Sequence, residues 1–256
     1  MFNKILVIAD EGAKIQDYTS LTQYVFKNLN PAADIYFSTG PMDVLDHSCS
    51  KLGFGGKMCI DGTKKFDEEK DDSYQFRIKS VGLKEESFIS KYPEIKTVNT
   101  SLMQKNIPCL IVSVEKNRKG HIKELHEQIC NLPEVAAIKM ILYVEHTVDA
   151  NDLPTALWRF CNNLDPKRDY HLCKRPTPNS GLPTPDSYHA CIGFDGTRKT
   201  KQFDDFNRDW PNIIVADNQT IKAVDEKWDQ LGIGSFIPSP SLKFKDQLYG
   251  QEAAVS

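Results

Sequence analysis

The chain has 256 residues, of which 40% are hydrophobic and 26% charged, and this composition is typical of globular proteins and excludes global disorder. Its 32 basic and 35 acidic side chains leave a formal net charge of −3, which gives no electrostatic reason to expect binding to nucleic acid or to an anionic membrane. No apolar run approaches the roughly 20 residues of a membrane-spanning helix, and we expect no signal peptide.

The first predicted element is a short buried strand at residues 4–8. A helix over about residues 17–29 follows, because its apolar residues recur at intervals of three and four. A second strand is expected at residues 35–37. The segment Cys59-Ile60-Asp61-Gly62-Thr63-Lys64-Lys65 stands further along the chain.

The second half begins with an apolar strand at residues 109–114 and a helix over about residues 121–131 that opens after Gly120. A strand at residues 140–144 comes next, so this stretch predicts a parallel strand–helix–strand unit. A helix over residues 152–164 follows, and a second Asp-Gly-Thr-x-Lys motif ends at Lys199.

Matching residues in the two halves stand at a nearly constant separation along the chain, which indicates an internal repeat. An offset of 135 residues joins Lys4 to Lys139, Asp17 to Asp152, Asn28 to Asn163, Leu29 to Leu164, Pro31 to Pro166 and Asp34 to Asp169. The offset is 134 residues between the aspartates of the two Asp-Gly-Thr-x-Lys motifs, Asp61 and Asp195. We therefore expect two related units, residues 1–104 and residues 105–256.

The predicted fold class is α/β, with two related units of mainly parallel sheet flanked by helices. The second unit is expected to end in a helix at about residues 218–231 and an extended, proline-rich arm at residues 237–242. The strand and helix at residues 109–131 have no counterpart before residue 4, so the first unit is expected to lack its opening strand and helix. Either this unit has degenerated, or the chain is the C-terminal part of something longer.

The seven cysteines form no Cys-x-x-Cys pair and their number is odd, which favours free, mostly buried thiols in a reducing cytoplasm. His121 and His126 are five residues apart on a predicted helix and face different sides of it. We therefore predict no metal site.

Three other segments have structural and functional interpretations. Residues 53–57, Gly-Phe-Gly-Gly-Lys, resemble a phosphate-binding loop in composition, but the apolar residues that follow favour a tight turn between strands over an anion site. Asp46 and His47 are a potential acid–base pair in a segment, residues 40–47, that is either a structural loop or the lining of a pocket. For residues 165–169 and the Asp-Gly-Thr-x-Lys motifs, turns held by ion pairs and side-chain caps are expected.

Several segments resemble the C-terminal region of UbiD-type decarboxylases. They are Val148-Asp149-Ala150-Asn151-Asp152, Leu157-Trp158-Arg159-Phe160, Asp165-Pro166-Lys167-Arg168-Asp169, Lys57-Met58-Cys59-Ile60-Asp61-Gly62-Thr63-Lys64-Lys65 and Ile111-Val112-Ser113-Val114-Glu115-Lys116 with Gly120. The resemblance covers nearly all of the chain, and the doubled form is similar to the long family members of quinone-biosynthesis type.

The resemblance implies a carboxy-lyase that reversibly decarboxylates aromatic or α,β-unsaturated acids with prenylated FMN, a divalent metal and a potassium ion. It also implies that the catalytic Glu-Arg-Glu constellation and most of the flavin site lie in an N-terminal domain, which no part of this chain resembles. We therefore expect no catalytic residue in this chain and no cofactor tightly bound to the chain alone.

The resemblance also points to two regions of the site. A family lysine directly before the strand contacts the flavin phosphate, which indicates Lys4, with Lys139 as the alternative. The loop after the next strand lines the substrate side of the family's active site, which indicates Pro41, Met42, Val44 and Leu45. The corresponding loop of the second half, residues 174–188, is long and proline-rich and is not expected to face an active site.

The expected function is that of the C-terminal part of a UbiD-family carboxy-lyase, which drives oligomerisation and covers the active site of the flavin domain. Menaquinone or ubiquinone biosynthesis is its candidate pathway. Its expected partners are further copies of the chain and an N-terminal flavin-binding domain, in the same or a separate polypeptide. The alternative is an assembly module that no longer serves catalysis, and a third hypothesis is a stand-alone enzyme with a phosphate ligand at residues 53–57.

Overall fold

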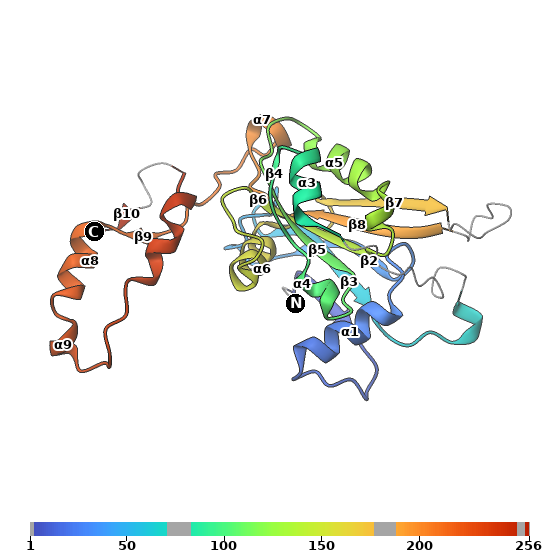
Figure 1. Cartoon of the computed structure of the whole chain (residues 1–256), viewed down its shortest axis with the longest axis horizontal. Helices are drawn as coiled ribbons and strands as arrows, with labels where there is room; N and C mark the ends of the chain where they lie inside the picture. Colours follow the sequence, from blue (N-terminus) through green and yellow to red (C-terminus); the bar gives the residue numbers. More distant parts are fainter. Residues whose placement is uncertain (1–2, 71–82, 177–187, 250–253, 256) are drawn as a thin grey trace. The chain divides into compact units, whose positions relative to one another are not determined.

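The computed structural model describes residues 3–70, 83–176, 188–249 and 254–255 of the chain (Figure 1). The chain divides into two compact units, Met1–Arg208 and Asp209–Ser256. Most of the proline-rich loop expected at residues 174–188 lies outside the described residues. Every helix in the described part is too short or too polar to cross a lipid bilayer.

The larger unit contains a five-stranded sheet in the order β4-β5-β6-β8-β7. Its strands are β4 (Ile95–Asn99), β5 (Cys109–Val114), β6 (Met140–Glu145), β7 (Tyr170–Pro176) and β8 (Tyr188–Asp195). β5, β6 and β8 run parallel, whereas β4 and β7 pair antiparallel at the two edges. All residues of β5 and β6 are buried, as expected for parallel strands with both faces covered.

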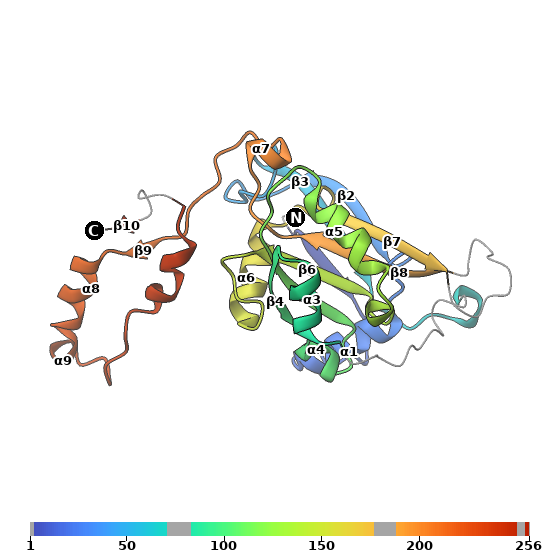
Figure 2. The same cartoon turned by 45° about the horizontal axis from the view of Figure 1, so that its top comes forward.

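Two helices, α3 (Glu85–Lys91) and α5 (His121–Cys130), lie over one face of this sheet (Figure 2). Three apolar residues of α5, spaced three and four apart, are buried: Ile122, Leu125 and Ile129. They share a core cluster with Ile141 and Tyr143 of β6. The helix α5 therefore covers the middle of the five-stranded sheet.

A second sheet has three strands in the order β1-β3-β2. The strands are β1 (Ile5–Ile8), β2 (Ile35–Pro41) and β3 (Phe54–Asp61). β1 is parallel to β3, and β2 is antiparallel to it. The predicted α/β fold, with two sheets flanked by helices, is confirmed, and every antiparallel strand of the larger unit's described part lies at a sheet edge.

The three-stranded sheet packs against the face of the five-stranded sheet that α3 and α5 leave free. Met58 of β3 belongs to the same buried cluster as Leu142 of β6 and Phe194 of β8. The helices α1 (Tyr18–Asn28) and α6 (Leu153–Asn163) add apolar residues to this cluster. This shared core joins the two halves of the larger unit.

The segment β1-α1-β2-β3 has the same element order and strand directions as β6-α6-β7-β8. The registers also match, because Ile5 lies opposite Met58 and Met140 lies opposite Ile192. Both helices begin at an aspartate whose side chain accepts a backbone hydrogen bond from three residues further on. These contacts recur at the sequence offset that links the two halves.

The two segments differ at one edge. Among the described residues, β1 pairs with β3 alone, whereas β6 lies between β5 and β8. Leu6 is 46% exposed and Ile8 is 43% exposed, while Ile141 and Tyr143, which occupy the matching register positions, are 0% exposed. In the described part of the chain, the three-stranded sheet therefore has an open edge and an apolar outer face.

The smaller unit contains the paired strands β9 (Val215–Ala216) and β10 (Ala254–Val255), helices α8 (Asn218–Asp225) and α9 (Trp228–Leu231), and a 3-10 helix (Pro240–Gln247). Where the sequence predicts one helix over residues 218–231, the structure has two, and α9 ends at Gly232 in the left-handed conformation. Part of the arm predicted to be extended is the 3-10 helix. The larger unit also has α4 (Ser101–Gln104), α7 (Lys201–Asp204) and the 3-10 turns Asp67–Glu69 and Pro133–Val135.

Candidate functional site

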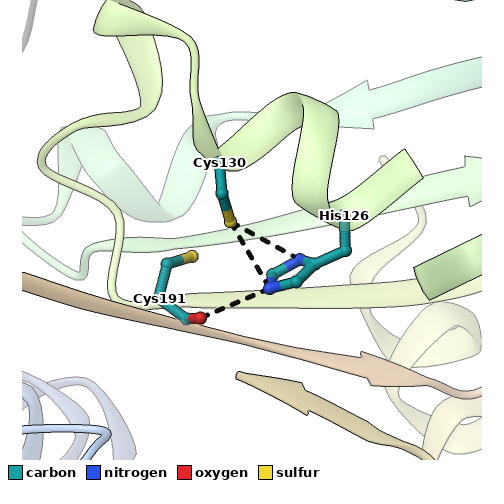
Figure 3. Close-up of side chains that lie close together, drawn as sticks. All are labelled: His126, Cys130 and Cys191. Atoms are coloured by element: carbon teal, nitrogen blue, oxygen red, sulfur yellow. Dashed lines mark hydrogen bonds between the residues drawn. The ribbon is translucent and has the colours of Figure 1, made fainter. Parts of the chain in front are cut away.

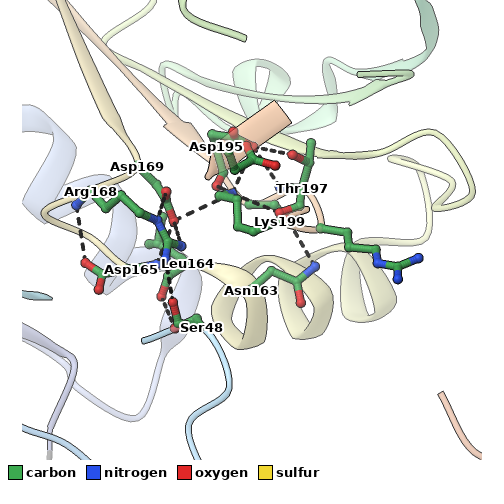
Figure 4. A network of polar contacts seen from close by, with 12 residues as sticks. Ser48, Asn163, Leu164, Asp165, Arg168, Asp169, Asp195, Thr197 and Lys199 are labelled. Atoms are coloured by element: carbon green, nitrogen blue, oxygen red, sulfur yellow. Dashed lines mark hydrogen bonds and ion pairs between the residues drawn. The ribbon is translucent and has the colours of Figure 1, made fainter. Parts of the chain in front are cut away.

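The two Asp-Gly-Thr-x-Lys motifs close the ends of β3 and β8. Asp195 accepts a hydrogen bond of 2.9 Å from the backbone N–H of Thr197, and its backbone oxygen accepts one of 2.6 Å from Lys199 (Figure 4). Thr63 repeats the first contact on Asp61, also at 2.9 Å. The motifs thus build turns, as their sequence indicates.

A buried ion network surrounds the second motif. The Nζ of Lys199 lies 3.3 Å from Asp195 and 3.6 Å from Asp169, and Arg168 contacts Asp169 at 2.6 Å (Figure 4). Burial opposes ionisation of Asp195, but the charges of Lys199 and Lys116 prevail and hold its pKa well below the ordinary value. Each of these buried charges therefore has a partner, and removing one side chain would leave another buried charge without its counter-ion.

A cavity of about 180 Å³ lies beside this network. Its lining includes Lys116, Lys199, Asp195 and Asp204, and Lys116 already pairs with Asp204 at 2.7 Å. The cavity is smaller than the roughly 300–1,000 Å³ of ordinary ligand sites. Its size and its paired charges favour a structural role.

Lys4, the residue expected to bind the cofactor, lies at the base of the loop after β2. Its Nζ is 2.8 Å from the carboxylate of Asp46, 3.1 Å from the hydroxyl of Ser48 and 3.2 Å from the backbone oxygen of Cys161 on α6. Lys139, at the matching position, donates instead to two backbone oxygens at the end of α1. Each lysine thus reaches the end of the other half's helix.

The four predicted substrate-loop residues divide into two kinds. Met42 is buried, at 3% exposed, whereas Val44 and Leu45 are 64% and 84% exposed, and Pro41 is exposed too. The backbone of Met42 donates to Gly53 at 2.9 Å and closes the loop. The positive φ of Gly53, +68°, favours glycine at this turn. The loop therefore presents an apolar tip on an anchored base.

Two arginines from the second half hold this base. Arg168 donates to the backbone oxygen of Ser48 at 2.7 Å, and Arg208 donates to that of Cys49 at 2.7 Å. Hydrogen bonds to backbone carbonyls from charged donors are among the stronger ones in proteins. The position of the loop in the first half is thus fixed by the second half.

Asp46 and His47 take separate partners. Asp46 faces Lys4, and although burial opposes its ionisation, hydrogen bonds from Lys4 and Ser48 lower its pKa. The Nε2 of His47 lies 3.3 Å from the side-chain oxygen of Asn163, and burial lowers the pKa of the imidazole. This geometry favours the structural interpretation of the two residues over an acid–base pair.

The glycines of residues 53–57 serve packing. Residues 54–61 form β3, so this segment opens no helix on which a phosphate could rest. The backbone of Gly56 donates to Asp165 at 3.1 Å, and a Cβ at Gly56 would lie 2.0 Å from an oxygen of that carboxylate. Lys57 donates to the backbone oxygen of Asn3 at 3.0 Å. A close approach between the two halves explains the glycine at position 56.

A cluster that the sequence analysis missed lies between α5 and β8. The ring of His126 and the thiols of Cys130 and Cys191 are buried, with their donor atoms all within 4.8 Å of one another (Figure 3). His126 and Cys130 are four residues apart on one helix face, a spacing that the sequence itself contains. Only the fold brings Cys191 to them.

The chain matches the family model of the 3-octaprenyl-4-hydroxybenzoate carboxy-lyase C-terminal domain, UbiD_C, over residues 1–62 and 81–188. An uncharacterized protein of Helicobacter pylori J99 is 25% identical over 223 residues, which cover 87% of this chain and 32% of that protein. Another of Aquifex aeolicus is 29% identical over 123 residues, 48% of this chain and 25% of that protein. The chain thus spans about a third or less of these relatives.

Among solved structures, the chain is similar to the closed form of vanillic acid decarboxylase from Sedimentibacter hydroxybenzoicus, with 17% identity and a TM-score of 0.45 over 72% of this chain and 39% of that one. It is also similar to the UbiD-class enzyme HmfF of Pelotomaculum thermopropionicum in complex with prFMN, with 17% identity and a TM-score of 0.35 over 49% and 25%. The family model matches most of the chain and reaches into both of its halves, and the chain therefore belongs to the UbiD family, whose C-terminal domain it contains.

Proposed function

We propose that the chain acts as the C-terminal part of a UbiD-family carboxy-lyase for aromatic or α,β-unsaturated acids. In this role it assembles with a flavin-binding domain, in the same or a separate polypeptide, and covers that domain's active site. Membership of the family supports the reaction class. The solved relatives named above, a vanillic acid decarboxylase and an enzyme in complex with prFMN, are consistent with an aromatic acid and a prenylated flavin.

The observation that carries this proposal is the open edge of β1. In the second half, β5 pairs parallel to β6 and α5 covers Ile141 and Tyr143. In the first half, the matching edge has no strand and the matching side chains, Leu6 and Ile8, are nearly half exposed in the described part of the chain. Exposed edges and apolar faces of this kind are sites for strand addition. We infer that the flavin-binding part supplies a parallel strand and a covering helix here.

The backbone geometry supports the same occupant. The N–H of Met58 donates to the backbone oxygen of Lys4, and the N–H of Gly62 donates to the backbone oxygen of Ile8. The even-numbered residues of β1 therefore direct their backbone groups toward β3. The backbone groups of Ile5 and Val7 therefore point to the open edge. A parallel strand would satisfy them, as β5 does for β6.

The loop at residues 41–45 is the proposed active-site cover. Val44 and Leu45 offer an apolar surface suited to an aromatic substrate, while Met42 anchors the loop in the core. Lys4, at the base of the same loop, is the proposed contact to the flavin phosphate, and binding would have to redirect its Nζ from Asp46. Quinone biosynthesis remains the proposed pathway.

The matching topology and contacts also support an internal duplication, which we propose for residues 1–104 and 105–256. The repeat of strand order, register and helix caps at one sequence offset is what a duplicated unit would produce. The open edge of β1 is then the place where the first unit differs from the second. Further copies of the chain are proposed as partners in an oligomer.

Reconstitution tests the proposal. The purified chain alone should neither bind prenylated FMN tightly nor release carbon dioxide from an aromatic acid. Co-expressed with the flavin-binding part of the enzyme, it should co-purify in a complex that decarboxylates. Leu6→Glu should abolish the complex, whereas Ile89→Glu, a similarly exposed position on α3, should leave it intact. Turnover by the chain alone would contradict the proposal, and a stable complex of copies that excludes the flavin-binding part would favour the assembly module.

A further inference from the structure

The space between α5 and the hairpin of β7 and β8 holds a concentration of metal-binding side chains. His126 and Cys130 come from α5, and Cys191 comes from β8. All three are 0% exposed. Figure 3 shows the Cys130 thiol and the His126 ring turned toward each other, with Cys191 on the strand below them.

A fourth sulfur joins this group from the neighbouring strand. Cys173 of β7 lies directly opposite Cys191 of β8 in the antiparallel register. Residues directly opposite each other in an antiparallel pair point to the same face, so Cys173 lies on the face of the hairpin that carries Cys191 and packs against the core beneath α5. One imidazole and three thiols from three elements therefore converge, and all seven cysteines of the chain are free of disulfides.

The spacing of the donor atoms fits tetrahedral coordination. The Nε2 of His126 lies 3.4 Å from the Sγ of Cys130. Two ligands of one tetrahedral zinc ion, bound through nitrogen and sulfur, stand about 3.5 Å apart, given bond lengths of about 2.0 and 2.3 Å. The donor atoms of His126, Cys130 and Cys191 all lie within 4.8 Å of one another. The Nε2 of His126 also lies 3.3 Å from the backbone oxygen of Cys191, and metal binding at Nε2 would replace this contact.

The surroundings supply an orienting contact and a charge of the right sign. The Nδ1 of His126 lies 3.0 Å from the hydroxyl of Tyr143, which can accept a hydrogen bond from Nδ1–H when Nε2 binds a metal. Arg175 donates to the backbone oxygen of Cys130, which places a cation beside the group. Three thiolates and one divalent ion carry a net charge of −1, which this guanidinium offsets.

We propose that His126, Cys130, Cys173 and Cys191 form a structural site for a thiophilic divalent cation of the zinc class. Binding joins α5 to the β7–β8 hairpin and displaces the three thiol protons to solvent. This site is separate from the loop at residues 41–45, so the test of metal binding does not depend on the proposed decarboxylase role.

Metal analysis of the reduced, purified full chain tests the site. About one zinc per chain should remain after dialysis, as expected for a closed structural site. Replacement by Co²⁺ should give the thiolate-to-cobalt charge-transfer band and the intense visible bands of a tetrahedral, sulfur-rich site. A chelator should lower the melting temperature. Absence of bound metal together with an octahedral cobalt spectrum would overturn the proposal.

Matched cysteine variants locate the metal. Cys130→Ser and Cys191→Ser should lose the cobalt charge-transfer band, and Cys173→Ser should weaken metal affinity by at least about tenfold. Cys109→Ser, a buried cysteine of β5 outside the cluster, should retain the full spectrum. Equal loss in Cys109→Ser would overturn the assignment. The spectrum of the unaltered chain remains a test even where a variant does not fold.

Discussion

The outer faces of the two sheets are built from strands of matching register, but one face is buried and the other is exposed in the described part of the chain. On β6, Ile141 and Tyr143 are fully buried beneath α5, while on β1 the matching Leu6 and Ile8 are nearly half exposed. Leu6, Ile8 and Ile141 are aliphatic and Tyr143 is aromatic, so the strand pattern alone does not reveal which face is covered. The neighbouring element decides: in the described part of the chain, β1 has no element in the position that β5 takes beside β6.

The largest expected effect comes from truncating a buried residue of β6, compared with the exposed residue at the matching position of β1. Ile141→Ala should lower the free energy of unfolding by about 4 kcal/mol, because it empties a fully buried site. Leu6→Ala, at the matching register position, should cost about 1 kcal/mol or less in the chain alone. Urea unfolding curves of both variants measure the difference. Equal losses would mean that the face of β1 is covered in solution.

A smaller effect is expected where α5 approaches β8. A Cβ at Gly193 would lie 2.5 Å from the ring of His126, whereas the matching position on the uncovered sheet carries Cys59. Gly193→Cys should therefore destabilise the chain by about 1–3 kcal/mol, and the reverse exchange, Cys59→Gly, by about 1 kcal/mol or less. Thermal unfolding distinguishes them. A tolerated Gly193→Cys would show that α5 does not press on the sheet.

Lys139, which lies between the two halves, predicts a pH dependence of stability. Burial lowers the pKa of Lys139 from 10.5 to about 8 in the folded chain. Between these two pH values the unfolded chain binds more protons at this residue, so its contribution makes stability rise with pH across that window. Lys139→Met should remove this rise, and the exposed Lys119→Met should not. Free energies of unfolding measured at pH 8 and pH 10 give the size of this rise. A rise in Lys139→Met equal to that of the unaltered chain would contradict the prediction.

The smallest expected effect concerns the loop base. The side chains of Lys4 and Asp46 are 15% and 12% exposed and form an ion pair of 2.8 Å, so Lys4→Met should cost about 1 kcal/mol. It should also speed proteolysis at residues 43–47. Lys70→Met, which breaks the more exposed pair with Asp67, should change neither quantity. Unaltered cleavage in Lys4→Met would show that this lysine does not anchor the loop.

Apolar spacing predicts β1, α1, β2, β5, α5, β6 and α6, and both α1 and α6 begin at an aspartate cap. The prediction of a buried strand at residues 4–8 is wrong in its burial, because Leu6 and Ile8 are nearly half exposed in the described part of the chain. The sequence pattern does not predict β4, β7 and β8. Spacing along the chain could not reveal the cluster around Cys130, since Cys173 and Cys191 reach it only through the pairing of β7 with β8. The adjacency of Asp46 and His47 in the sequence likewise allows an acid–base pair as one of two interpretations. Their actual partners, Lys4 and Asn163, lie 42 or more residues away and are set by tertiary packing.

Hydrogen exchange at β1, measured with and without the flavin-binding part, tests the central proposal most directly. In the chain alone the amides of Ile5 and Val7 should exchange quickly, while those of the matching Met140 and Leu142 stay protected. Adding the flavin-binding part should slow exchange at Ile5 and Val7 in parallel with the gain of decarboxylase activity. An active mixture in which these two amides still exchange as in the free chain would contradict strand addition at β1.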